Sequence, residues 1–189
     1  MEAFPFRAVA TSRSYEGIDR MPVCAVLDCV RSLYNVGSFF RTGDAAGLGH
    51  LYLTGYTGCP PHPGLSKTAL GAEDHLPWEH HQEALPLLET LRQQGYELVA
   101  VETSPRAVDL YDWQPRFPTC VVFGSEVDGI SPEIARTCDV HVRVPMLGAK
   151  QSLNVSVAGG VVVFELLRKY RLLHEQFRSS GASGATRWP

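Results

Sequence analysis

Apolar and polar positions along this chain follow two different periods. Compact apolar runs rich in β-branched residues predict strands, and apolar residues that recur every three or four positions predict helices. The predicted strands are 23–29, 50–54, 96–101, 119–123 and 140–144, and the predicted helices are 35–46, 82–94, 131–137 and a long one from Leu153 past Tyr170. This alternation predicts an α/β fold with a mostly parallel sheet that helices cover on both faces.

Length and composition favour one folded domain. The chain has 189 residues, of which 44% are hydrophobic and 20% are charged, as is typical of globular proteins. We expect residues 1–175 to form a single domain with its core at 22–171, and the basic segment 176–189 to form a flexible tail. No apolar run approaches the ~20 residues that span a bilayer, and the start lacks a secretory signal, so we expect a cytoplasmic protein without a membrane partner.

Cysteine and histidine patterns predict neither a disulfide framework nor a metal site. The five cysteines contain no C-x-x-C pair, so free thiols in a reducing compartment are the simplest interpretation. His80 and His81 are adjacent, and His75 lies close by in the sequence, but this spacing fits no standard metal site. We expect the paired histidines to lie in a solvent-facing loop.

The charge balance changes this picture only locally. A formal net charge of −3 argues against a surface coated in basic residues for gripping nucleic acid. The average conceals an asymmetry, because acidic residues dominate 72–104 whereas basic residues dominate from Arg168 to the end. Local basic ridges are therefore compatible with an anionic partner, and any affinity for nucleic acid is expected to be modest and sensitive to salt.

The segment 30–49 contains the first candidate chemistry. On the predicted helix, Phe39 and Phe40 belong to the apolar face. Arg41 lies off that face and follows Gly37 by four residues, so its side chain leans over a turn that carries no side chain. The spacing predicts an open slot beside a guanidinium, close to Asn35. The alternative is an ordinary surface arginine.

A second candidate segment follows the strand 119–123. A glycine at the carboxyl end of a parallel strand, here Gly124, lets a ligand approach the backbone where α/β sheets usually bind ligands. Neither a dinucleotide fingerprint nor a P-loop is present. Glu126, in the same loop, is a candidate base, a ligand-orienting acceptor or a turn residue.

The third segment joins the last strand to the long helix. Ser152 and Asn154 place hydroxyl and amide groups at the positive end of that helix. Gly159 and Gly160 lie inside it at a cost of about 1 kcal/mol each relative to alanine, so we expect another element to approach closely there. The apolar face beyond them fits either the core or a subunit interface.

These three segments together resemble one known family. They read N-x-G-x-x-x-R from Asn35 to Arg41, G-x-E-x-x-G from Gly124 to Gly129, and P-M-x-G-x-x-x-S-L-N-V-S-V-A from Pro145 to Ala158. In order and spacing they resemble the motifs of the SpoU family, the 2′-O-ribose RNA methyltransferases of the SPOUT (α/β-knot) superfamily. The resemblance covers roughly residues 22–171.

The resemblance implies properties that the residue pattern alone does not. It implies a trefoil knot in the C-terminal part, S-adenosylmethionine as cofactor, no metal, RNA as substrate, and a homodimer through the C-terminal helix and knot region. Because the chain resembles a small stand-alone member of the family, we favour tRNA over rRNA. By motif position, the implied cofactor-binding residues are Thr103, Gly124, Val144, Met146 and Leu153, and the implied catalytic residues are Asn35, Arg41, Glu126, Ser152 and Asn154.

The family assigns the central role to the position of Arg41. A guanidinium with a pKa above ~12 is a poor base at neutral pH, so we favour an Arg41 that binds the adjacent phosphate while a phosphate oxygen or water takes the proton. Glu126, Ser152 and Asn154 are then expected to hold Arg41 and the ribose.

Two other functions are compatible with parts of the sequence. The chain could be a knot-fold RNA-binding or assembly protein that binds the cofactor without methylating, but the intact Arg41, Glu126 and Asn154 disfavour this. It could also be a small nucleotide-dependent α/β oxidoreductase, which the absent glycine fingerprint disfavours.

Overall fold

A single parallel sheet organises the computed structural model, which describes residues 17–179. The strands are β1 (Val23–Asp28), β2 (His50–Thr54), β3 (Trp78–His81), β4 (Glu97–Val101), β5 (Val108–Asp109), β6 (Thr119–Phe123) and β7 (Val140–Arg143). Their order across the sheet is β3-β2-β1-β6-β4-β7-β5, and every neighbouring pair is parallel. The most buried strands, β1 and β6, occupy the centre because their residues are apolar on both faces.

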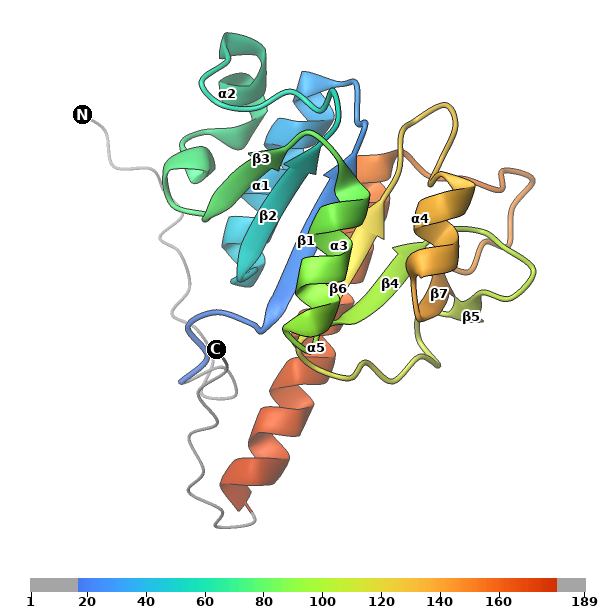
Figure 1. The fold of residues 1–189 in the computed structure, drawn as a ribbon. Coiled ribbons are helices and arrows are strands. Elements are labelled where there is room, and N and C mark those ends of the chain that lie inside the picture. Colours follow the sequence, from blue (N-terminus) through green and yellow to red (C-terminus); the bar gives the residue numbers. More distant parts are fainter. Residues whose placement is uncertain (1–16, 180–189) are drawn as a thin grey trace.

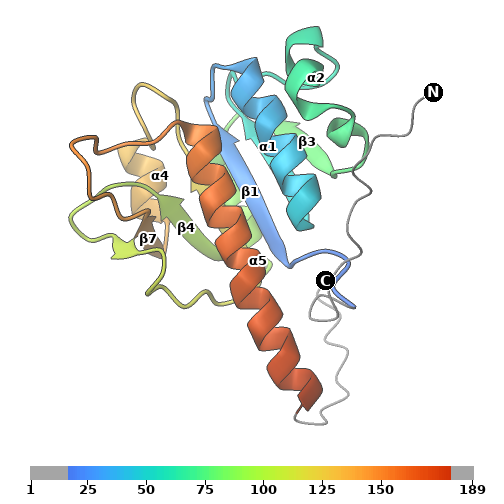
Figure 2. The same cartoon turned by 180° about the vertical axis from the view of Figure 1, so that it is seen from behind.

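Helices cover both faces of this sheet. They are α1 (Leu33–Ala46), α2 (Pro63–Ala69), the short 3₁₀ helix η2 (Ala72–Asp74), α3 (Ala84–Gln93), α4 (Pro132–Thr137) and α5 (Val155–Ser179). Figure 1 shows α3 and α4 on one face, and Figure 2 shows α1 and α5 on the other with α2 beside α1. Each face buries its own apolar cluster against the sheet, which is the expected layering of an α/β domain.

The structure confirms the predicted α/β architecture and corrects three details. The five predicted strands are present, but the sheet also contains β3 and β5. His80 and His81 lie on β3, an edge strand, rather than in a loop. Residues 55–64 are rich in glycine and proline, which is typical of a loop, but α2 begins within them at Pro63, and the His62 side chain caps this helix by accepting from the Gly64 N–H.

The C-terminal helix is longer than its sequence pattern indicates. It runs through Ser179, so the first residues of the segment predicted to be a flexible tail are helical. Residues 180–189 lie outside the described part of the chain, as do residues 1–16 with Arg7 and Arg13.

Close contact between α1 and α5 explains Gly159, one of the two glycines within α5, whereas a Cβ on Gly160 would meet only Thr42 Cγ2 at 3.9 Å. A Cβ built on Gly159 would lie 2.2 Å from the Phe39 ring, and that ring is buried against Phe123 with centroids 5.0 Å apart. The expected close approach at this point of the helix is therefore confirmed. It fixes the N-terminal end of α5 beside α1, at the carboxyl edge of the central strands.

Candidate active site

The Glu126 carboxylate joins the loop after β6 to the start of α1. Its Oε2 accepts from the Arg31 backbone N–H at 2.9 Å, and its Oε1 accepts from the Ser32 N–H at 3.1 Å and from Asn35 Nδ2 at 2.8 Å. Burial alone would raise the pKa of this carboxyl, but the N–H donors outweigh it and hold the pKa below its ordinary value. Glu126 is consequently ionised at neutral pH, with both oxygens already accepting hydrogen bonds.

Asn35 extends this connection to the N-terminus of α5. Its Oδ1 accepts from Asn154 Nδ2 at 3.2 Å and from Ser156 Oγ at 3.4 Å. Asn154 in turn caps α5, because its Oδ1 accepts from the Ser156 N–H at 2.9 Å and the Val157 N–H at 3.3 Å. We call Glu126, Asn35, Asn154 and Ser156 the polar bridge; it joins the three sequence motifs within one chain.

The position of the bridge follows from the topology. Asn35 and Glu126 follow β1 and β6, which are neighbours at the centre of the sheet. The carboxyl ends of parallel strands meet at one edge, and ligands bind there where the chain changes direction across the sheet. Of the predicted catalytic residues, the structure therefore brings together Asn35, Glu126 and Asn154.

Arg41 and Ser152 lie outside this bridge. Arg41 is two turns into α1, about 9 Å along the axis from Asn35, and its exposed side chain makes no hydrogen bond or ion pair with any described residue. Ser152 is exposed and likewise makes no hydrogen bond within residues 17–179. The contact of Glu126, Ser152 and Asn154 with Arg41, expected from the sequence, is not formed within this chain.

The open slot predicted at Gly37 is also wrong. A Cβ at Gly37 would lie 2.3 Å from the Leu65 carbonyl oxygen and even closer to Thr68 Oγ1, both on α2. Gly37 therefore lets α2 pack directly on α1. The space beside Arg41 is solvent along the stripe of Tyr34, Ser38 and Arg41, not a slot in the helix.

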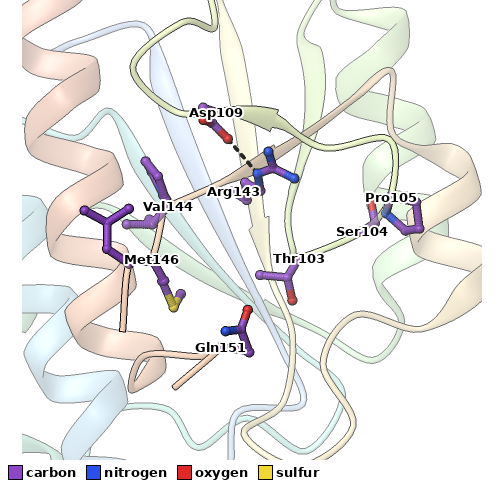
Figure 3. A pocket seen from close by; sticks show the side chains of 10 residues that line it. Thr103, Ser104, Pro105, Asp109, Arg143, Val144, Met146 and Gln151 are labelled. Carbon is purple, nitrogen blue, oxygen red and sulfur yellow. Dashed lines mark hydrogen bonds and ion pairs between the residues drawn. The ribbon is translucent and has the colours of Figure 1, made fainter. Parts of the chain in front are cut away.

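Two adjoining cavities open at the carboxyl ends of β4 and β7. The larger has a volume of about 510 Å³ and the smaller about 100 Å³. Both are lined by Thr103, Val144, Met146, Arg143 and Gln151, as Figure 3 shows for the larger. The smaller cavity reaches Ser152, Leu153 and Ala158, which flank the polar bridge at the start of α5. Four of the five predicted cofactor-binding residues thus line one connected space.

The fifth, Gly124, lies outside these two cavities, and its role towards a cofactor stays a prediction. A Cβ there would lie 2.1 Å from the backbone of Gly129. The close approach at Gly124 is therefore made by the chain's own loop. Glu102, which the sequence analysis overlooked, fastens the same loop by accepting from the Ile130 N–H at 3.2 Å, and it also lines the smaller cavity.

An ion pair marks the wall of the larger cavity. Arg143 Nε donates to Asp109 Oδ1 at 2.6 Å, and Figure 3 shows the pair among the lining side chains. Within residues 17–179, no group of three His, Cys, Asp or Glu side chains is placed to hold a metal ion. Across the same residues no helix has the length and hydropathy needed to cross a bilayer.

The fold and the site together define a class of protein: an all-parallel α/β domain with a ligand-sized cavity and a polar bridge at the carboxyl edge of its sheet. The chain belongs to the SpoU rRNA Methylase family, whose sequence model matches residues 22–164. The resemblance predicted from the three motifs is confirmed. Membership also implies the α/β knot for the C-terminal part of the fold.

Similar proteins extend this assignment. A 23S rRNA (guanosine-2′-O-)-methyltransferase of Pseudomonas syringae is 38% identical over 149 residues, which are 78% of this chain and 59% of that protein. The structure of the A. aeolicus TrmH/SpoU tRNA modifying enzyme matches with a TM-score of 0.75 and 28% identity over 90% of this chain and 85% of that one. An AdoMet-bound rRNA methyltransferase from Sinorhizobium meliloti matches with a TM-score of 0.70 and 28% identity over 77% and 56%. The chain spans about 60% of the length of the curated relatives it matches.

Proposed function

We propose that this protein transfers a methyl group from S-adenosylmethionine to a ribose 2′-hydroxyl of RNA. The observation that carries the proposal is the polar bridge beside the connected cavities, because the segment 151–158 contributes to both. Two proteins similar to this chain support the proposal: the 23S rRNA (guanosine-2′-O-)-methyltransferase of P. syringae and the AdoMet-bound rRNA methyltransferase of S. meliloti.

The cavities fit the implied cofactor. Their combined size lies in the range of small-molecule sites, about 300–1,000 Å³. Apolar side chains of Val144, Met146 and Leu153 and the polar groups of Thr103 and Gln151 are the mixture that binds an adenosine-containing ligand. These residues would hold S-adenosylmethionine, which when bound supplies a methyl group already activated on a sulfonium.

The chain's own residues then have to position the hydroxyl and accept its proton. Glu126 is a poor base, because its pKa is lowered and both oxygens accept hydrogen bonds. It acts instead as an anchor that fixes the Asn35 amide. Arg41, exposed and unpaired among the described residues, binds the phosphate next to the target ribose, and a phosphate oxygen or water takes the proton.

We further propose that two copies of the chain assemble through α5. Apolar side chains on one side of this helix remain in solvent: Val157 is 52% exposed and Phe164, seven residues on, is 49% exposed. Residues seven apart share a helix face, and Leu172 at 38% continues the apolar surface. Arg41 borders this surface, because its neighbour Thr42 lies beside Gly160 of α5. A second copy would therefore bring further groups to Arg41.

Among RNA substrates we propose tRNA. The support is that the A. aeolicus tRNA modifying enzyme is matched over 85% of its length, whereas the rRNA methyltransferase of P. syringae is matched over 59%. Mapping ribose 2′-O-methyl groups in cells with and without this protein tests the choice. Loss of a methyl group from tRNA supports it, and loss only from rRNA contradicts it while leaving the reaction in place.

Single-turnover methylation by Arg41→Lys tests the role of Arg41. Lysine keeps the charge but not the two-pronged contact with phosphate, so we expect the rate to fall by about 10- to 1,000-fold, the span of about 1.4–4 kcal/mol in barrier. Arg136→Lys on α4, an exposed arginine on the other face of the sheet, is the matched control and should keep the wild-type rate. A near-wild-type rate for Arg41→Lys would exclude both a base and a phosphate-binding role.

A further inference from the structure

An exposed tyrosine lies on the other side of Glu126 from the cavities. Tyr56 follows β2, and its side chain is 56% exposed although it is large and mostly apolar. It belongs to none of the three motifs. Exposed aromatic residues at the carboxyl edge of a parallel sheet are candidates for ligand contact, because that edge is where such sheets bind.

Arg31 holds this ring in place and connects it to the polar bridge. The guanidinium carbon lies 5.8 Å from the centre of the Tyr56 ring, and Arg31 Nε donates to the Tyr56 hydroxyl at 3.4 Å. The backbone N–H of the same arginine donates to Glu126 at 2.9 Å. One residue therefore contacts the aromatic ring with its side chain and the bridge with its backbone, which fixes the ring next to the site.

The sheet order places the bridge between the ring and the cavities. Strands run in the order β2-β1-β6-β4-β7; Tyr56 follows β2, Glu126 follows β6, and the cavities lie beyond β4 and β7. From β2 to β4 is three strand spacings, about 14 Å at ~4.8 Å each. A ribose bound over the polar bridge therefore has room to place its own base, or the next base of the strand, against Tyr56.

We propose that Tyr56 and Arg31 form a stacking platform for an unpaired RNA base next to the ribose that is methylated. The inference rests on the proposed function and names the form of RNA that the site accepts. Single-stranded RNA binds proteins largely by stacking splayed bases on aromatic rings and guanidinium planes, whereas bases inside a duplex are not available for this. The platform therefore selects a loop or an end over a continuous helix.

Binding of two RNA probes tests the platform independently of methyl transfer. The probes are a dye-labelled twelve-residue oligouridine and a blunt duplex of the same length, measured by fluorescence anisotropy. We expect Tyr56→Ala to weaken binding of the single strand by about 5- to 150-fold, the usual effect of losing one stacked base, and to leave duplex binding unchanged. Tyr56→Trp keeps a flat ring and should retain the affinity for the single strand.

Controls separate a local effect from a general one. Tyr111→Ala removes another tyrosine of similar exposure, 54%, from the loop after β5, and should bind both probes as the wild type does. Calorimetry with S-adenosylmethionine should give the same affinity for Tyr56→Ala and the wild type. In turnover with unfractionated RNA from cells lacking the protein, Tyr56→Ala should raise KM more than it lowers kcat.

Three results would overturn the platform: wild-type protein that binds no oligouridine, a Tyr56→Ala affinity within twofold of the wild type, or an equal loss for strand and duplex. A wild type that binds the strand and responds to Tyr56→Ala but methylates no RNA would instead overturn the proposed function and leave the platform standing. The two failures are therefore distinguishable.

Discussion

Glu126 contributes through its fixed charge rather than by exchanging protons. Hydrogen bonds from Arg31, Ser32 and Asn35 stabilise the ionised form, and the pKa of Glu126 lies below its ordinary value for that reason despite partial burial. Because the folded-state pKa is lower than that of the unfolded chain, the stabilisation is present above the unfolded pKa. It is lost as pH falls through the folded pKa.

The substitution Glu126→Gln tests the direction of this pH dependence of stability. At pH 7 we expect it to lower the free energy of unfolding by about 1–2 kcal/mol, since hydrogen bonds to a charged acceptor are weakened at a partly exposed site. The difference from the wild type should shrink as pH falls below the ordinary glutamate pKa of about 4.3. It should disappear below the lowered pKa of the folded protein, where the wild-type carboxyl is also neutral. Urea unfolding at a series of pH values measures both.

Glu97 provides a control, because its pKa is shifted in the opposite direction from that of Glu126. It is 8% exposed, and burial raises the pKa of its carboxyl although the Arg116 N–H and charge act in the other direction. A raised pKa means that the stabilisation is present at low pH and is lost as pH rises through the folded pKa. Glu97→Gln should therefore be neutral or stabilising at pH 7, and a loss equal to that of Glu126→Gln would contradict both assignments.

At the scale of single residues, the sequence predicted which residues belong to the candidate site but not which of them contact one another. Asn35, Glu126 and Asn154 were found because their motifs could be recognised, and they do meet in space. Ser156, although part of the third motif, and Tyr56 were missed. A serine in the first turn of a helix and a tyrosine in a loop look ordinary until the strand order brings them to one edge. Side-chain position across a sheet is set by topology, which local patterns do not contain.

At the scale of elements, the crossing of α1 and α5 can be tested with two neighbouring glycines. Gly159→Ala would gain about 1 kcal/mol of helix propensity. The new methyl group would overlap the Phe39 ring, which cannot retreat because it is buried against Phe123. Overpacking usually costs about 1–3 kcal/mol, so we expect a net loss of up to about 2 kcal/mol in thermal or urea unfolding.

Gly160→Ala is the matched control for that substitution. Its Cβ would have only ordinary van der Waals contact, 3.9 Å from Thr42 Cγ2. The propensity gain then stands alone, and the variant should be more stable than the wild type by up to about 1 kcal/mol. Equal effects from the two glycines would show that the contact with Phe39 does not determine the packing of α5.

Another contact of α5 could not have been predicted from its pattern. Lys169 lies on the buried side of the helix, is 8% exposed, and donates to the carbonyl oxygens of Leu110, Tyr111 and Trp113. Burial lowers the pKa of its ammonium although Glu165 opposes the shift. The pattern alone predicts that a lysine in a helix faces solvent. Lys169 instead connects α5 to the loop after β5, and the sequence did not predict the short strand β5.

At the scale of the whole molecule, the order of the parallel strands brings the three sequence motifs to one edge of the sheet. Strand positions could be predicted because β1, β4 and β6 are continuous apolar runs. The order β3-β2-β1-β6-β4-β7-β5 could not, because it depends on contacts between distant segments. That order puts the polar bridge between the cavities and Tyr56. It also leaves α5, which carries the apolar stripe, and α1, which carries Arg41, on the same face of the sheet (Figure 2).

An exposed apolar stripe lies beside Arg41, which pairs with no residue of the described range 17–179. This arrangement predicts that the second copy of the chain is required for activity. Phe164→Glu places a charge in the middle of the stripe without touching the core, since Phe164 is 49% exposed. We expect the wild type to sediment as a dimer and the variant as a folded monomer with an unchanged far-ultraviolet circular dichroism spectrum. Burying an unpaired carboxylate costs several kcal/mol, enough to raise the dimer dissociation constant by at least about 100-fold.

The same variant separates assembly from cofactor binding. Thr103, Val144 and Met146 line the cavities within one chain, so the monomer should retain part of its affinity for S-adenosylmethionine in calorimetry. Methyl transfer should fall with the dimer fraction, because Arg41 would lack the groups that only a partner supplies. Tyr111→Glu, at a position of similar exposure in the loop after β5 and outside the apolar stripe of α5, should remain dimeric and active. A Phe164→Glu protein that is monomeric yet fully active would show that one chain holds the complete site.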